Sequence, residues 1–271
     1  MGFYRIDGKM PFGYSHSEVD APQKVNPHFH NYYEIMFFLK CDAYYMVEGN
    51  KYEITEGDIL FTNPRELHCP VFKSLHKYQR SILTFKQSYL SDFITEKYNP
   101  FDVLDKRKLG TKNKIPAELV RNYGIDEKIR IIAEYYESDK PEKELIIKTN
   151  LVQILICMNN LIMTEIKSIK PSNIDYVIEY VNKHLTEKIT LEMLENQFHL
   201  NKYHISHAFK SKTGFSILEY INNKRIVMAK ELILDGLPLN IVAEKVGFND
   251  YSNFYRSFKK TLGYSPKKLR S

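Results

Sequence analysis

The sequence predicts a multidomain α and β protein: an N-terminal β-barrel with helices, followed by an all-α part of two helix-turn-helix units joined by a linker helix. Three observations predict this class. Short runs rich in β-branched and aromatic residues follow one another closely from about residue 25 to 86. Helical spacing replaces them after residue 86. A small motif then occurs twice, in residues 205–221 and 254–270.

The N-terminal strands are predicted by four runs, EIMFFL, AYYMV, KYEI and DILF, with turns at EGN (48–50) and EGD (56–58). Many short strands at close spacing indicate a barrel or a sandwich. Residues 1–24 contain scattered Gly and Pro and show no clear period, so we expect an arm there.

Two helices are predicted after the strands, over residues 123–137 and 144–167. Apolar residues of the second helix step by four, three, four and three, which places them on one face; they are Ile147, Leu151, Ile154, Met158 and Leu161. This face either packs on the barrel or pairs with a second subunit, and we assign it to dimerisation. Leu155 and Ile162 widen the stripe, so both contacts can coexist.

The domain boundary is predicted at KSIKPSN (167–173), a short polar joint that contains a Pro. The predicted organisation is therefore an arm over 1–24, a barrel domain over 25–166, a linker over 167–173 and a helical domain over 174–271.

The first helix-turn-helix unit follows a helix whose inward face carries Val177 and Val181. Thr190 can cap the short helix LEMLENQF, and HLN makes a turn into the helix KYHISHAFKSKT. Gly214 suits the left-handed position that ends this helix. Ser216 and Glu219 then form a capping box for the linker helix ILEYINNKRIVMAKELIL.

The second unit repeats the first, with LNIVAEKV as its short helix, GFND as its turn and YSNFYRSFKKTL as its exposed helix. Phe258, Lys259 and Gly263 correspond to Phe209, Lys210 and Gly214. Two such helices on a rigid spacer could enter successive major grooves of DNA, about 34 Å apart.

Charge supports a DNA partner, because residues 171–271 carry a net charge of +5 and the first 170 residues only +1. A helix in the major groove needs donors and acceptors on its exposed face. The predicted DNA contacts are Lys202, Tyr203, Ser206, His207, Lys210, Asp250, Tyr251, Ser252, Asn253, Arg256, Lys259 and Lys260. The alternative is a helical bundle whose charged faces are only solvated.

The N-terminal part contains HFHNYYE (28–34), and a continuous strand would place His28, His30 and Glu34 on one face. His68 follows in NPRELH. Three imidazoles and a carboxylate could bind Zn or Fe, contact an organic effector, or serve the structure alone. We predict effector contact and assign no metal and no cofactor.

Two further side chains join the predicted effector site. Arg65 has forked donors that suit a hydroxyl pair or a carboxylate, and Tyr32 shares the parity of the histidines and could stack on a sugar ring. The arm could also complete the inner face of the barrel, with Phe12, Tyr14 and His16 as candidates.

The C-terminal motif resembles the signature of AraC/XylS-type transcription regulators. The residues that fit it in order are Ala243, Val246, Gly247, Phe248, Ser252, Phe254, Arg256, Phe258, Lys259, Gly263, Ser265, Pro266 and Arg270. The resemblance implies that the two exposed helices insert into adjacent major grooves and that Arg225 occupies the usual linker Arg position. The chain departs from the family at Ser206-His207, where Ser-Arg is common.

The N-terminal residues resemble the cupin barrel, in which His-x-His, a Glu four residues on and a later His hold a metal. Regulators of the AraC/XylS family often carry such a barrel and bind an organic effector without metal. The resemblance therefore implies an activator that responds to a sugar or another carbon source, dimerises, binds promoter DNA and works with RNA polymerase.

Two other functions compete with this interpretation. A metal-dependent cupin enzyme with a helical appendage would use His28, His30, Glu34 and His68 as ligands, but it leaves the repeated unit unexplained. A constitutive DNA-binding protein with an empty barrel would respond to no small molecule. Three cysteines without a pattern and no apolar segment long enough for a bilayer predict a cytoplasmic protein that does not enter membranes.

Overall fold

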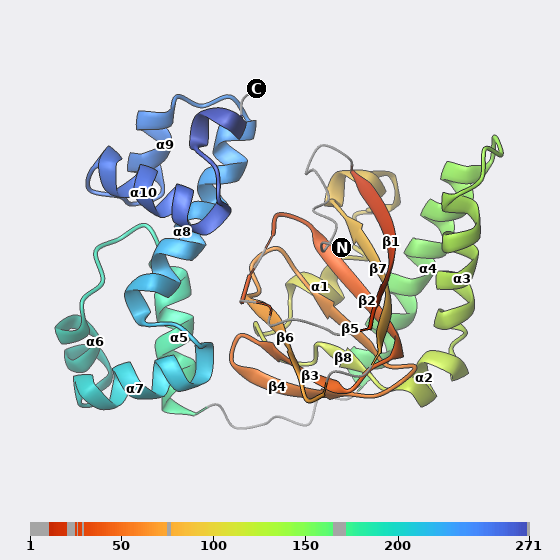
Figure 1. Ribbon diagram of the computed structural model, residues 1–271, viewed down its shortest axis with the longest axis horizontal. Coiled ribbons are helices and arrows are strands. Elements are labelled where there is room, and N and C mark those ends of the chain that lie inside the picture. Colours follow the sequence, from red (N-terminus) through yellow and green to blue (C-terminus); the bar gives the residue numbers. More distant parts are fainter. Residues whose placement is uncertain are drawn as a thin grey trace. The chain divides into compact units, whose positions relative to one another are not determined.

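The computed structural model of the chain separates into two compact units, residues 1–167 and 168–271 (Figure 1). The structure describes residues 11–20, 25, 27, 28, 30–74, 77–164 and 172–269. The predicted linker falls largely outside the described residues, as does Arg270.

The described part of the N-terminal unit forms two antiparallel sheets. The larger sheet has the order β1-β7-β2-β5-β8 and the smaller sheet the order β4-β3-β6. The strands are β1 (Phe12–Val19), β2 (Tyr33–Lys40), β3 (Ala43–Val47), β4 (Asn50–Ile54), β5 (Ile59–Thr62), β6 (His68–Phe72), β7 (Tyr78–Phe85) and β8 (Lys114–Ile115). The four strands predicted from EIMFFL, AYYMV, KYEI and DILF are thus confirmed as β2 to β5.

The predicted turn between β3 and β4 is confirmed and has positive φ at both central residues, 47° at Glu48 and 79° at Gly49. Positive φ at both central residues of a two-residue hairpin gives the turn a backbone twist that matches the right-handed twist of the flanking strands. Glu48 tolerates the left-handed conformation because its carboxylate is buried and accepts a 2.6 Å hydrogen bond from the backbone N–H of Leu67. The hairpin is thereby tied to the segment that leads into β6.

The two faces of the larger sheet bury different cores, because side chains alternate along each strand. Ile35 and Leu83 face the helices, whereas Met36 and Phe38 face the smaller sheet and pack with Tyr45. The helices of this unit are η1 (Gln87–Phe93), α1 (Asp102–Asp105), α2 (Ala117–Asn122), α3 (Ile125–Tyr136) and α4 (Lys143–Thr164). Helices α3 and α4 lie together beside β1 and β7 (Figure 1).

Helix α4 corrects the predicted dimer contact. Its predicted dimerisation residues are all buried in the core of the N-terminal unit; they are Ile147, Leu151, Ile154, Met158 and Leu161. Of the two contacts that the stripe left open, packing on the sheet is the one observed, because the outer face of the sheet is itself apolar and needs a cover. By length and composition α4 could cross a membrane, but its apolar face packs in this core.

The N-terminal segment also differs from the prediction. Residues 12–19 form β1, which pairs along the whole of β7, so this part of the expected arm is an edge strand. Without β1, the backbone N–H and C=O groups along that edge of β7 would have no strand partner, which is why residues 12–19 pair with it. Phe12 stacks on Tyr89 with ring centroids 5.0 Å apart, and Tyr14 contacts Tyr136. Phe12 and Tyr14 therefore face the helices and not the inside of the barrel. Residues 1–10 and 21–24 lie outside the described residues.

The described part of the C-terminal unit is helical throughout. Its helices are α5 (Asn173–Lys183), α6 (Leu191–Phe198), α7 (Lys202–Thr213), α8 (Ile217–Leu234), α9 (Leu239–Lys245), α10 (Tyr251–Leu262) and η2 (Pro266–Leu269). The predicted caps are confirmed: Thr190 accepts from the N–H of Met193, and Ser216 and Glu219 form the capping box. Gly214 and Gly263 end α7 and α10 in the left-handed conformation.

The two helix-turn-helix units are joined by more than the linker helix. Arg225 on α8 is buried and donates to the carbonyls of Leu185 (2.6 Å) and Glu187 (2.7 Å), in the loop before α6. Gly247, in the turn before α10, has φ of 90° and lies so close to the same loop that a Cβ would approach the Thr186 carbonyl oxygen to 2.4 Å. The loop 184–188 of the first unit is therefore held against the turn of the second.

Candidate functional site

A cluster of three ionisable side chains lies within the N-terminal unit. Nε2 of His30 and Nε2 of His68 each lie 3.2 Å from Oε2 of Glu34. The three side chains are at most 9% exposed, and one nitrogen or oxygen of each lies within 4.8 Å of the others. The structure thus brings together three residues of the predicted effector set.

Different elements position these side chains. Glu34 is the second residue of β2 and His68 the first of β6, whereas His30 precedes β2 and is separated from it by a bend at residues 31 and 32. The predicted continuous strand from His28 to Glu34 is therefore wrong. His28 instead forms an isolated bridge with His68, with backbone hydrogen bonds of 3.0 and 2.9 Å, and its side chain is exposed.

Backbone carbonyls orient both buried imidazoles. Nδ1 of His30 lies 2.9 Å from the carbonyl oxygen of Tyr32, and Nδ1 of His68 lies 2.9 Å from that of Glu66. A carbonyl oxygen only accepts, so each Nδ1 carries a proton and donates it. Both Nε2 atoms are then directed at the carboxylate of Glu34. Nε2 of His68 is buried and has no hydrogen-bond partner among the described residues.

Burial and the close contacts shift the ionisation of this cluster. Burial lowers the pKa of His30, against the opposing effect of its hydrogen bond to Glu34. Burial raises the pKa of Glu34, but the two neighbouring histidines outweigh it and hold the pKa well below its usual value. The cluster therefore holds an ionised carboxylate beside an imidazole that resists protonation.

The other predicted effector residues divide into two groups. Tyr32 stacks on His30, with centroids 3.8 Å apart and planes 6° apart, and the ring of His28 lies 4.6 Å from that of His68. Tyr32 and His28 therefore both lie against the cluster of His30, Glu34 and His68. Arg65 lies apart from the cluster. Its side chain is 62% exposed, and its guanidinium donates to the backbone carbonyl of Asp105.

A second polar group, which the sequence pattern did not predict, lies inside the barrel. Arg80 on β7 is buried and donates to the hydroxyl of Tyr45 and, at 3.0 Å, to the sulfur of Met36. The hydroxyls of Tyr45 and Tyr78 lie 2.7 Å apart. The signal was an Arg between Tyr78 and Ile82, at the inward parity of the strand YQRSILTF.

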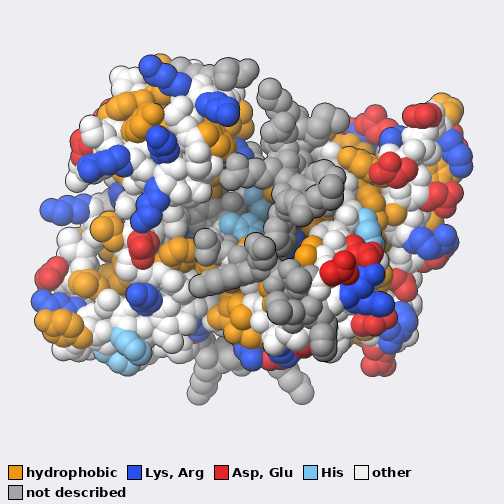
Figure 2. All heavy atoms as spheres, in the orientation of Figure 1, with side chains coloured by type: hydrophobic (Ala, Val, Ile, Leu, Met, Phe, Trp, Pro, Cys, Tyr) orange, Lys and Arg blue, Asp and Glu red, His pale blue; other side chains and the backbone are white. Residues whose placement is uncertain are grey.

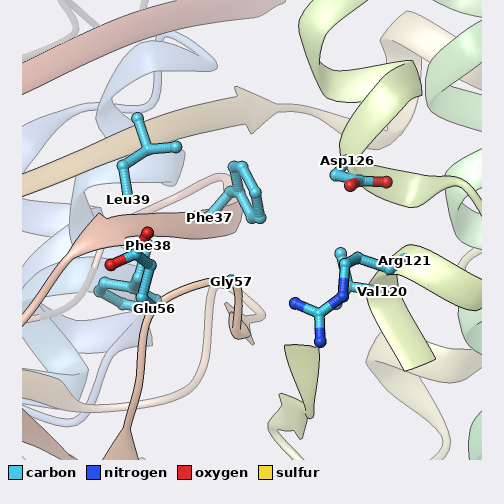
Figure 3. A pocket seen from close by; sticks show the side chains of 8 residues that line it. All are labelled: Phe37, Phe38, Leu39, Glu56, Gly57, Val120, Arg121 and Asp126. Carbon is cyan, nitrogen blue, oxygen red and sulfur yellow. The ribbon is translucent and has the colours of Figure 1, made fainter. Parts of the chain in front are cut away.

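A surface pocket of about 350 Å³ lies away from these groups, between β2 and helices α2 and α3. Figure 3 shows Phe37 on the strand side, facing Arg121 and Asp126 on the helix side. Residues of this pocket were not predicted as a site, and its lining mixes apolar and charged side chains without a buried polar group.

In the C-terminal unit, α7 and α10 bury their aromatic residues and expose their polar ones. Phe209 on α7 and Phe254 and Phe258 on α10 are fully buried. Tyr203 is 75% exposed, and the other predicted DNA contacts are exposed or half-buried. Figure 2 shows Lys and Arg side chains spread over the visible face of this unit, with few acidic side chains between them.

The exposed face of α10 is organised by hydrogen bonds between its own side chains. Asp250 caps the helix by accepting from the N–H of Asn253 at 2.7 Å, and the amide of Asn253 also donates to this carboxylate. Arg256 in turn donates to Oδ1 of Asn253 at 2.6 Å. Asp250, predicted as a DNA contact, therefore serves as the cap that orients Asn253.

Comparison with known proteins agrees with both units. Residues 13–113 match the family described as "AraC-like ligand binding domain", and residues 194–271 match a helix-turn-helix domain family. A barrel of this kind followed by two helix-turn-helix units defines a ligand-responsive class of DNA-binding regulator. The chain belongs to the AraC/XylS family of transcription regulators.

Similar proteins include the HTH-type transcriptional activator RhaS of Escherichia coli O1:K1, which is 20% identical over 93% of this chain and 90% of its own length. The bifunctional transcriptional activator/DNA repair enzyme AdaA of Bacillus subtilis is 34% identical over 38% of this chain, and the match spans only 54% of AdaA. Among solved structures, ToxT of Vibrio cholerae O395 is 15% identical over 96% of this chain and 97% of its own, with a TM-score of 0.42.

Proposed function

We propose that this regulator binds promoter DNA by inserting α7 and α10 into successive major grooves. The observation that carries the proposal is the repeated arrangement of the two helices: each is capped at its start, ends at a left-handed Gly and buries its Phe residues while exposing polar side chains. An amphipathic helix of this kind offers donors and acceptors to base edges and cations to phosphates. The contacts of Arg225 and Gly247 with the loop 184–188 fix the orientation of α7 relative to α10.

The test is selection of binding sites from random duplexes by the full chain, followed by titration of the selected site. We expect a site with two elements about one helical turn apart. Selection of no sequence, or of a single element that does not change when α7 is altered, would contradict the proposal.

The proposed effector is a small polyhydroxylated molecule, such as a sugar, that binds at the cluster of His28, His30, Tyr32, Glu34 and His68. The cluster offers an ionised carboxylate, imidazole nitrogens and a stacked aromatic ring. Hydroxyl groups are matched by such acceptors and donors. Arg65 is left out of this proposal because its guanidinium is directed to the backbone carbonyl of Asp105, whereas the ring of His28 lies against that of His68.

A thermal-shift screen of the full chain against mono- and disaccharides tests the effector. A ligand present at 100 times its dissociation constant stabilises the folded protein by about 2.7 kcal/mol, which is several degrees. The shift should disappear in His28→Ala and Tyr32→Ala and persist in Arg65→Ala. A response to no compound would favour constitutive DNA binding.

The remaining parts of the proposal follow from this role. We place a homodimer contact on the outward face of α4, where Leu145 and Ile156 are 61% and 37% exposed. Leu145→Glu combined with Ile156→Glu should then yield monomers in light scattering.

Activation through RNA polymerase and a cytoplasmic location are proposed from the role at promoters. Run-off transcription with purified polymerase tests the activation.

A further inference from the structure

The face of β2 that is directed at the helices is only partly covered by them. Ile35 is fully buried there, but Phe37 and Leu39, which follow at the same parity, are half-buried. Two surface pockets of about 350 Å³ each lie along this part of β2, and Phe37, Leu39 and Asp126 line both of them. The two pockets therefore adjoin, and we call them together the outer groove. Each has the volume of a small-molecule site.

The first pocket of the outer groove contains charged side chains that have no partner among the described residues. Arg121 on α2 and Asp126 on α3 both line it, and Figure 3 shows the guanidinium of Arg121 directed into the pocket. Neither side chain forms a hydrogen bond or an ion pair with a described residue, and the two do not pair with each other. Glu56, in the turn before β5, adds a second carboxylate in the same state.

Gly57 keeps the guanidinium of Arg121 accessible from the pocket. Its φ is 87°, and an added Cβ would lie 2.8 Å from Cβ of Ala117 and 3.3 Å from Nη1 of Arg121. A side chain at residue 57 would therefore push against α2 and fill the space in front of the guanidinium. Because glycine stands there, this space is open to a ligand.

The second pocket of the outer groove extends this site along α3 with apolar side chains. Ile129 and Ala133 line it, together with Leu39 from β2. Its charged residues Glu127 and Arg130 already pair with each other, since Nε of Arg130 donates to the carboxylate at 3.0 Å. The groove thus combines a charged first pocket with an apolar continuation.

We propose that the outer groove binds a zwitterionic α-amino acid with an apolar side chain. The guanidinium of Arg121 matches the ligand carboxylate, because its forked donors form bidentate pairs with such groups. The carboxylate of Asp126 accepts hydrogen bonds from the ligand ammonium, and the apolar side chain lies over Phe37 and Leu39. A simple amine would leave the guanidinium without an anion, and a simple carboxylic acid would bring no cation to Asp126.

The experiment is calorimetric titration of the full-length protein, without DNA or sugar, with L-leucine, L-methionine and L-phenylalanine. We expect one saturable site per chain for at least one of these amino acids. Arg121→Gln and Asp126→Asn should each weaken its binding by about 10–100-fold, the effect of losing one charge-assisted hydrogen bond. The N-acetyl derivative and the decarboxylated amine of the same amino acid should bind more weakly by a similar factor.

Glu118→Gln is the matched control, because Glu118 is an exposed carboxylate of α2 that lines neither pocket, and it should leave the titration unchanged. Thermal unfolding of each variant without ligand verifies folding. No saturable binding by the wild type, or equal binding by the wild type, Arg121→Gln and Asp126→Asn, would overturn the proposal.

The variant Tyr32→Ala separates this site from the proposed effector site in the barrel. Amino-acid binding should persist in Tyr32→Ala, and a thermal shift with a sugar should persist in Arg121→Gln. Loss of amino-acid binding in Tyr32→Ala but not in Arg121→Gln would place the ligand in the barrel and overturn the proposal. DNA binding and the response to sugars are measured separately, so failure here leaves the proposed function standing.

Discussion

The second helices of the two helix-turn-helix units have the same length and the same Gly at their ends, but their exposed faces are organised differently. On α10 the side chains of Asp250, Asn253 and Arg256 form a continuous hydrogen-bonded row. On α7 the side chains of Ser206 and His207 make no hydrogen bond within the described part of the chain.

This difference has a consequence for DNA recognition. An Arg already held by an Asn loses less conformational entropy when it reaches a base edge than a free side chain does. We therefore expect α10 to contribute most of the sequence specificity and α7 to add affinity that depends less on sequence.

The largest expected effect comes from disrupting the contact between the two helix-turn-helix units at Gly247 and Thr186. Gly247→Ala places a methyl group 2.4 Å from the Thr186 carbonyl oxygen at a φ of 90°. Backbone strain and overpacking each cost about 1–3 kcal/mol, so the free energy of unfolding should fall by about 2–6 kcal/mol in a denaturant titration.

Gly236→Ala is the control for that substitution, because Gly236 has a φ of 87° but an added Cβ would meet nothing within 4 Å. Gly236→Ala should therefore lower the free energy of unfolding only by the cost of the backbone strain. Equal losses in the two variants would show that the contact with Thr186 does not hold the units together.

The next effect separates the two exposed helices. Arg256→Ala should reduce affinity for the selected DNA site by about 1–3 kcal/mol and relax the base preference at one position. Lys210→Ala on α7 should weaken binding to all sequences alike, because it removes a phosphate contact. Site selection with each variant measures both changes, and a relaxed preference in Lys210→Ala alone would reverse the assignment of roles.

A gain is expected on α7 from restoring the family residue. His207→Arg adds a permanent cation to the exposed face, and one additional phosphate contact should steepen the dependence of log affinity on log salt by about 0.9. Titrations at several salt concentrations measure this slope. His16→Arg, in the N-terminal unit, adds the same charge and should leave the slope unchanged; a steeper slope there as well would indicate a general charge effect.

The smallest expected effect concerns the ion pair that joins α5 to α7 in the first helix-turn-helix unit. Asp175 completes the capping box of α5 by accepting a hydrogen bond from the backbone N–H of Ser172, and its carboxylate pairs with Nζ of Lys212 on α7 at 2.7 Å. Burial raises the pKa of Asp175, but Lys212 and Ser172 outweigh it and lower the pKa to about 2. Because the folded pKa lies below the unfolded value of about 3.9, this stabilisation is complete above pH 4 and is lost as the pH falls towards 2.

Asp175→Asn should therefore lower the free energy of unfolding by about 1–2 kcal/mol at pH 7, and the difference from wild type should shrink between pH 4 and 2. Urea titrations across this range measure it. The exposed Asp235→Asn serves as the control. A difference that stays constant with pH would assign the effect to altered capping and not to the ion pair.

Local signals predicted much of the fold correctly. The caps at Thr190 and Ser216, the glycines that end α7 and α10, and the turn at Glu48–Gly49 were all read from neighbouring residues. They were predictable because each depends on contacts over a few residues. The AraC/XylS assignment was equally accessible, since it rests on the order of residues in one motif.

The same reasoning failed where a segment needed a distant partner. Residues 12–19 became a strand because β7 offered an edge, and the apolar stripe of α4 became core because the sheet offered an apolar face. Neither partner can be identified from the period of the segment itself.

The sequence by itself determined the helices from α3 to α10, that the helix-turn-helix unit is doubled and that His28, His30, Glu34 and His68 are candidates for one site; it did not predict η1, α1 or α2. Only the tertiary structure decided that His30, Glu34 and His68 converge while Arg65 stays exposed, and that Arg225 and Gly247 clamp the two units together. The physical reason is range: caps and periodicity act within a few residues, whereas these contacts form only when strands and loops far apart in the chain are packed side by side.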